Sequence, residues 1–153
     1  MKYLDALIIG AGFSGLYQLH CLRDKLKLNT LVVEEGKDIG GTWYWNTYPG
    51  ARCDSESFTY GFTFSEKIFK NWTWKERYPK QNVILKYLKY FSNELKLNKN
   101  IVFNEKVISA KYIEKNNFWK VQTNNKKKYY TKYLICAVGS VSYTHLRAHE
   151  TPL

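Results

Sequence analysis

Cysteines are few in this sequence, and their positions argue against two kinds of site. Cys21, Cys53 and Cys136 are odd in number and far apart, and none belongs to a Cys-x-x-Cys pair. This pattern favours neither a disulfide framework nor a zinc site, and it indicates a reducing, cytoplasmic compartment.

Long apolar runs are missing too. No stretch approaches the ~20 apolar residues of a membrane helix, and Asp5 interrupts the run after Lys2, which argues against a signal peptide.

Acidic residues are also scarce, since 13 Asp and Glu face 24 Lys and Arg, for a net charge of +11. The lysines are scattered among asparagines, tyrosines and isoleucines, as an adenine-rich coding sequence would give, and residues 126–128 are their one cluster. We therefore expect no nucleic-acid partner, although binding through lysines would predict salt-sensitive retention of DNA. Without a long Gly, Ser or Pro run, 153 residues fit about one globular domain.

A glycine motif follows the first apolar run of the chain. Residues 3–9 read YLDALII and predict a strand buried on both faces, GAGFSG follows, and a helical pattern begins at Ser14. In this context the first glycine permits a tight turn, the second lets a phosphate approach, and the third lets helix pack on strand. The predicted dinucleotide-binding residues of the turn are Gly10, Gly12, Phe13, Ser14 and Gly15.

A second predicted strand, LVVEE, contains Glu34 about 20 residues after the glycines. A carboxylate there is placed to accept hydrogen bonds from adenosine ribose hydroxyls, and the N-terminus of the helix favours a pyrophosphate. The two strands should be parallel neighbours, since a β-α-β crossover is almost always right-handed. The alternative is an ordinary β-α-β turn without a ligand.

The rest of the chain predicts one helix, several strands and an aromatic loop. Residues 57–64 suggest an extended segment, and 81–97 an amphipathic helix. Residues 101–140 alternate apolar and polar and predict a small antiparallel meander with turns at Asn116-Asn117 and Asn124-Asn125. The stretch YLICAVG should then rejoin the first sheet, which completes an α/β fold.

The aromatic loop GGTWYWNTYPGARCD, residues 40–54, has too many glycines for a strand and a Tyr-Pro-Gly that no helix interior carries. Together with GAGFSGLY and WTWKERYPKQNVILKYL, it resembles the N-terminal part of the Baeyer–Villiger monooxygenases, which are class B flavin monooxygenases. The resemblance extends over nearly all of residues 1–140. It implies a truncated Rossmann-like FAD-binding domain, a parallel sheet with a small antiparallel meander.

The resemblance also implies which residues bind FAD and NADPH. The first glycine motif and Glu34 would bind FAD, and Gly41, Thr42 and Trp43 would lie along its pyrophosphate and isoalloxazine. Aromatic rings suit a wide, planar flavin, so Trp43 and Trp45 are the candidates to cover it. Arg52 and Asp54 would lie beside flavin and nicotinamide, and Asp54 would orient Arg52 or a cofactor amide. The strand end 137–139 would pass close to the flavin.

The activity implied by the resemblance is the oxidation of ketones. NADPH would reduce FAD, dioxygen would add at the flavin C4a position, and the peroxide would attack a ketone to give an ester or lactone. The alternatives are N- or S-oxygenation of a soft nucleophile, or an inactive fragment that only binds FAD. The family's catalytic arginine would lie beyond this sequence, so no catalytic residue is assigned within it.

Residues 141–153, VSYTHLRAHETPL, do not continue the family pattern. They resemble the translation of a transposon-end sequencing adapter read in frame. We therefore expect a partial FAD-binding domain over residues 1–140 and a non-native tail over 141–153. His145 and His149 would otherwise suggest a helical metal pair, but in such a tail we expect no metal site.

Overall fold

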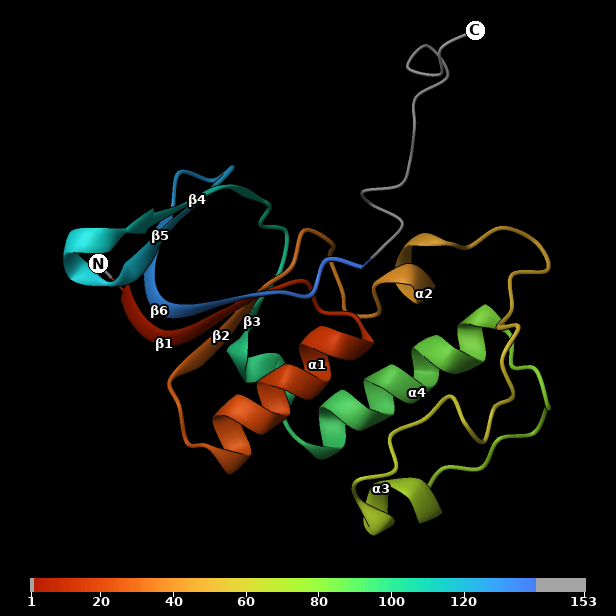
Figure 1. Cartoon of the computed structure of the whole chain (residues 1–153). Helices are drawn as coiled ribbons and strands as arrows, with labels where there is room; N and C mark the ends of the chain where they lie inside the picture. Colours follow the sequence, from red (N-terminus) through yellow and green to blue (C-terminus); the bar gives the residue numbers. More distant parts are fainter. Residues whose placement is uncertain (1, 140–153) are drawn as a thin grey trace, which may run out of the picture.

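The computed structural model describes residues 2–139, which form one six-stranded mixed sheet in the order β3-β2-β1-β6-β5-β4 (Figure 1). The central strand β1 (Lys2–Ile9) pairs in parallel with β2 (Thr30–Val33) and with β6 (Lys128–Cys136). The short strand β3 (Ile101–Val102) adds in parallel to β2. The predicted α/β fold with a parallel sheet is confirmed.

The predicted meander is confirmed as well, and it is continuous with the parallel sheet. Strands β4 (Val107–Ile113) and β5 (Phe118–Thr123) pair antiparallel, and β5 pairs antiparallel with β6. The first turn, after the 3-10 helix η3 (Glu114–Asn116), has the expected left-handed asparagine, since φ of Asn117 is +52°. In the second turn Lys126, and neither Asn124 nor Asn125, has positive φ, at +61°.

The first helix begins as predicted but changes its winding halfway. Helix α1 (Phe13–Leu19) continues into the π-helix η1 (His20–Lys25). Leu16 and Leu19 are fully buried, whereas Leu26, expected on the same apolar face, is 63% exposed. The Leu26 N–H donates to the Cys21 carbonyl five residues back, at 3.0 Å. The wider turn shifts the later residues around the axis, and this rotation turns Leu26 outward.

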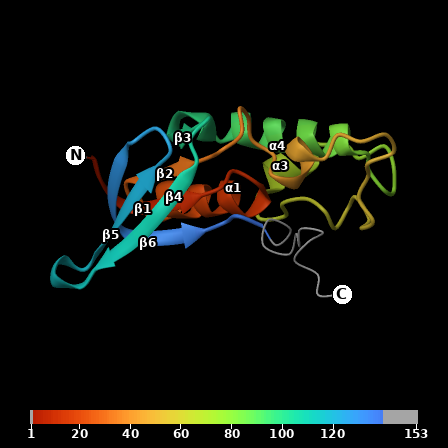
Figure 2. The same ribbon diagram turned by 90° about the horizontal axis from the view of Figure 1, so that it is seen from above.

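Helix α4 (Gln81–Glu94) lies beside α1 on one face of the sheet (Figures 1 and 2). Its apolar stripe packs with α1 and the strands in one core cluster, which includes Ile8, Leu16, Ile84 and Phe91. The predicted helix is therefore confirmed, and its burial follows the helical period. The remaining helical elements are short: α2 (Thr42–Trp45), α3 (Glu66–Lys70) and the 3-10 helix η2 (Leu97–Asn100).

The expectation of an extended segment at residues 57–64 is wrong, because turns, bends and irregular backbone occupy this stretch. Its alternating aromatic rings pack onto the two long helices instead of lying in a strand. Phe62 stacks over Tyr17 with ring centroids 5.8 Å apart, and the ring centroids of Phe62 and Phe91 are 4.0 Å apart. Alternation here reflects contact with helices, which sequence periodicity alone does not distinguish from a half-buried strand.

Candidate functional site

The glycine turn between β1 and α1 is closed by main-chain contacts. The Gly10 N–H donates to the Val33 carbonyl at 2.9 Å, and its φ of +101° favours glycine. A Cβ on Gly10 would lie 2.5 Å from the Ala137 oxygen, and one on Gly15 would lie 1.9 Å from the Gly10 oxygen. These two positions have no room for any side chain, as the motif predicts.

A second glycine segment crosses this turn, main chain against main chain. The Gly40 N–H donates to the Ala11 carbonyl at 3.0 Å, and Gly40 has a φ of +134°. Gly41 has a φ of +54°, and a Cβ on it would lie 3.0 Å from the Gly12 Cα. The structure thus brings together the two segments that the sequence analysis assigned to one cofactor, although almost 30 residues separate them.

The start of α1 lies at this crossing, and its first turn contributes no negative charge. Gly12 is the N-cap, the first turn contains no acidic residue, and the side chain of Ser14 is exposed. Phe13 is half-buried and packs on Tyr60, with ring centroids 5.0 Å apart. First-turn N–H groups have no acceptor within their own helix, so this end of α1 suits an anion.

Glu34 lies directly behind the glycine turn and is 5% exposed. Its Oε2 accepts the Ala11 N–H and its Oε1 accepts the Gly36 N–H, each at 2.7 Å. The carboxylate therefore fixes the turn itself, a role that the sequence analysis missed. A carboxylate oxygen has more than one acceptor direction, and the predicted bonds to ribose hydroxyls stay a prediction.

The two predicted flavin-covering tryptophans differ in their surroundings. Trp43 is buried, its Nε1 donates to the Tyr60 hydroxyl at 3.1 Å, and its carbonyl accepts the side-chain amide of Gln81. Trp45 is 58% exposed, and Thr42 at the start of α2 is also exposed. Trp45 consequently offers an accessible ring, whereas Trp43 packs in the core, and stacking by either residue stays a prediction.

Tyr60 connects this loop to the next predicted residues. Burial raises the pKa of the Tyr60 phenol despite the hydrogen bond from Trp43, and the charges of Cys53 and Asp54 raise it further. The phenol therefore stays protonated at neutral pH. Cys53 itself is buried, as expected for a small apolar residue, whereas the Asp54 side chain is exposed.

Arg52 is exposed and lines an open pocket of about 280 Å³. Its Nη2 pairs with a Glu76 oxygen at 3.6 Å, and the Lys80 Nζ pairs with the other oxygen at 3.5 Å. Lys80 and Gln81 line the same pocket, and sequence reasoning did not assign them. Both belong to the family-like stretch WTWKERYPKQ, but no spacing rule connects that stretch to Arg52.

The end of β6 completes the edge of the sheet beside the glycine turn. The Ala137 N–H donates to the Ile9 carbonyl at 2.9 Å, so the chain continues past the last strand alongside β1. Its carbonyl then lies against Gly10, and Gly139 has a φ of +76°. Segment 137–139 is thus adjacent to the predicted site. His145 and His149 lie outside the described residues.

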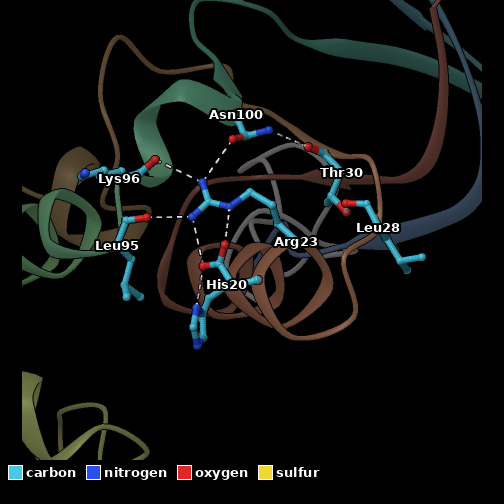
Figure 3. Close-up of polar contacts among 8 residues, drawn as sticks. His20, Arg23, Leu28, Thr30, Leu95, Lys96 and Asn100 are labelled. Atoms are coloured by element: carbon cyan, nitrogen blue, oxygen red, sulfur yellow. Dashed lines mark hydrogen bonds and ion pairs between the residues drawn. The ribbon is translucent and has the colours of Figure 1, made fainter.

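His20 is buried and belongs to the network of polar contacts that Figure 3 shows. Its Nδ1 contacts an Asp24 oxygen at 2.8 Å, and Asp24 also pairs with Arg23. The Arg23 guanidinium then donates to the Leu95 carbonyl at 2.7 Å, and this bond joins η1 to the end of α4. The contact with Asp24 thus satisfies one nitrogen of the His20 ring within its own helical segment.

Within residues 2–139, no helix combines the length and apolar character required to cross a bilayer.

Comparisons with known proteins identify relatives over almost the whole chain. The family described as pyridine nucleotide-disulphide oxidoreductase matches residues 7–150. A Baeyer-Villiger monooxygenase from Pseudooceanicola batsensis is 40% identical over 93% of this chain and 26% of its own length. A phenazine N-monooxygenase from Lysobacter antibioticus is 39% identical over 92% of the chain and 26% of its own. The chain thus spans about a quarter of these relatives.

A solved structure agrees with the fold. The crystal structure of the OTEMO complex with FAD and NADP is 36% identical, covers 95% of this chain and 27% of its own, and has a TM-score of 0.88.

Proposed function

Because the chain belongs to the pyridine nucleotide-disulphide oxidoreductase family, we propose that residues 1–140 supply the FAD-binding part of an NADPH-dependent flavin monooxygenase. The observation that carries this proposal is the crossing of Gly10–Gly12 by Gly40–Gly41. The two glycine segments meet main chain against main chain, beside a helix whose first turn contains no acidic residue. That combination suits the pyrophosphate of a dinucleotide.

The neighbouring residues fit the rest of FAD. Glu34 closes the far side of the turn, where it would accept the adenosine ribose hydroxyls. Thr42 and the exposed ring of Trp45 lie on the loop that would follow the pyrophosphate toward the isoalloxazine. Arg52 and Asp54 are exposed further along the same loop, where they would face flavin and nicotinamide.

For the whole protein we propose Baeyer–Villiger oxidation of ketones to esters or lactones. When bound, FAD would pass two electrons from NADPH to dioxygen, one oxygen atom entering the product and the other leaving as water. In this chemistry the described residues bind and orient the cofactor. The 40% identical Baeyer-Villiger relative supports this reaction class for the whole protein.

N- or S-oxygenation is the second candidate, and the phenazine N-monooxygenase relative favours it. Offering the purified protein a cyclic ketone and an aromatic amine, each with NADPH and dioxygen, separates the two reactions. A lactone supports the first reaction, and an N-oxide without any lactone supports the second. NADPH absorbance that does not fall with either substrate would assign the chain a cofactor-binding role without turnover.

FAD uptake tests the part of the proposal that rests on this chain. We expect added FAD to bind the purified protein, and the bound flavin to survive gel filtration and change its fluorescence. A folded protein, verified by circular dichroism, that takes up no FAD would overturn the proposal.

We also propose a cytoplasmic protein without a nucleic-acid partner. The three cysteines form no disulfide among the described residues, which suits a reducing compartment. Binding to DNA at low salt would contradict the proposal that the protein has no nucleic-acid partner.

A further inference from the structure

Segment 102–105, which begins with the last residue of β3, makes both main-chain hydrogen bonds of Glu34. The Glu34 N–H donates to the Val102 carbonyl at 2.8 Å, and the Glu34 carbonyl accepts the Glu105 N–H at 2.9 Å. The Asn104 N–H donates to the Gly36 carbonyl at 3.0 Å. Because the Glu34 carboxylate accepts the Ala11 N–H of the glycine turn, segment 102–105 determines where that turn is held.

Glu105 attaches this segment to the meander through a buried carboxylate. The residue is 1% exposed. Its Oε1 accepts the Thr123 hydroxyl at 2.8 Å and the Tyr129 hydroxyl at 2.9 Å, and its Oε2 accepts the Lys127 Nζ at 2.7 Å. A buried carboxylate is tolerated only when such donors surround it. The cluster thus joins β5, β6 and segment 102–105 at one point.

The charge of Glu105 follows from these contacts. Burial acts to raise the pKa of Glu105, but the hydrogen bonds from Lys127, Thr123 and Tyr129 outweigh it, so the pKa lies below its usual value. Burial and the carboxylate raise the pKa of Tyr129, which keeps its hydroxyl a donor. The charges next to these contacts are Lys106, which follows Glu105, and Glu35, which follows Glu34; they pair at 2.9 Å and are both more than half exposed. Glu105 is therefore ionised at neutral pH.

We propose that Glu105 is a positioning residue of the dinucleotide site, acting through Glu34. Its carboxylate locks segment 102–105 to the meander, the segment fixes the main chain of Glu34, and Glu34 holds the glycine turn in the form that accepts a pyrophosphate. This inference rests on the proposed function for its ligand. The hydrogen-bond path itself is independent of any ligand.

The Glu105→Gln variant keeps the shape of the side chain but removes the charge that Lys127 faces. We expect the FAD dissociation constant to rise about 5- to 10-fold, the scale of one buried hydrogen-bond defect. Hydrogen exchange of the Ala11 and Gly36 amides, both bonded to Glu34, should accelerate. The Leu7 amide in β1 should accelerate less, because its exchange reports general opening of the sheet.

The matched control is Glu114→Gln, which removes the same charge from an exposed position on η3. It should change neither FAD affinity nor exchange at Ala11. Equal acceleration at Ala11, Gly36 and Leu7 in Glu105→Gln would mean only general destabilisation, and it would overturn the inference.

If Glu105→Gln does not fold, the Tyr129→Phe variant tests the inference, because it removes one hydroxyl that donates to Glu105 and keeps the aromatic ring. A smaller but selective acceleration at Ala11 supports the inference, and exchange identical to the parent protein overturns it. Failure of the parent protein to bind FAD would count against the proposed function alone, because the exchange comparison needs no FAD.

Discussion

The glycine crossing and the Glu105 cluster hold distant segments together by opposite means. At the crossing, main chain meets main chain, and a Cβ at Gly15 would lie 1.9 Å from an oxygen. In the cluster, one buried carboxylate gathers three side-chain donors. The glycine turn has no room for an added atom at Gly10 or Gly15, and the cluster is weakened when the charge of its carboxylate is lost. Substitutions at the two places should therefore fail for different reasons.

The largest expected effect is that of Gly15→Ala. The new methyl would overlap the Gly10 carbonyl, so helix and turn must separate, and we expect a loss of about 3 kcal/mol or more in the free energy of unfolding. Urea denaturation followed by circular dichroism measures it. A stability within about 0.5 kcal/mol of the parent protein would show that this contact is not close-packed.

Acid should weaken the Glu105 cluster next. Because the pKa of Glu105 is lowered by folding, its contribution is complete above the unfolded value of about 4.3 and is lost as pH falls through the folded value. At pH 6 we expect Glu105→Gln to be about 1–3 kcal/mol less stable than the parent protein.

Denaturation of Glu105→Gln and the parent protein at a series of pH values measures their stability difference. This difference should shrink as pH falls below about 4. A difference that stays constant down to acid unfolding would rule out ionisation of Glu105 as its source.

Gly12→Ala separates folding from binding at the crossing. A Cβ there would lie 3.5 Å from the Gly41 Cα, an ordinary contact, and φ of −81° accepts alanine. Stability should change by less than about 1 kcal/mol. The methyl would occupy the path of the phosphate, so FAD affinity should fall about tenfold, as fluorescence titration would measure. Unchanged affinity would place the pyrophosphate elsewhere.

The smallest expected effect is at the open pocket beside Arg52. Glu76→Gln removes a carboxylate shared by two exposed cations at 3.5 and 3.6 Å. Exposed pairs contribute little, so unfolding should change by less than about 0.5 kcal/mol, and less still in high salt. A loss above about 1 kcal/mol at high salt would mean that this pair is shielded from solvent.

Local patterns predicted the glycine turn, but they predicted neither its crossing by the second glycine segment nor the Glu105 cluster. The strands β1 and β2 and the glycines between them follow from an apolar run, a motif and a helical period, all within 35 residues. Helix α4 was predicted for the same reason. The crossing by Gly40–Gly41 was predicted only through the family resemblance, because no local pattern shows which loops meet.

The Glu105 cluster had no comparable signal. Its partners lie 18, 22 and 24 residues away, and only pairing of β5 with β6 brings them together. The π-helix and the turns at 57–64 were missed for a related reason. In each case, contacts with other elements decided a conformation that local periodicity describes differently.

The placement of β6 has a consequence for how the protein is made. β6, one of the two partners of β1, is synthesised more than 120 residues after it, since Lys2 pairs with Tyr129. Until then the newborn central strand keeps an open edge. Such distant pairing slows folding and prolongs exposure to aggregation, so the nascent chain stays vulnerable until β6 has emerged.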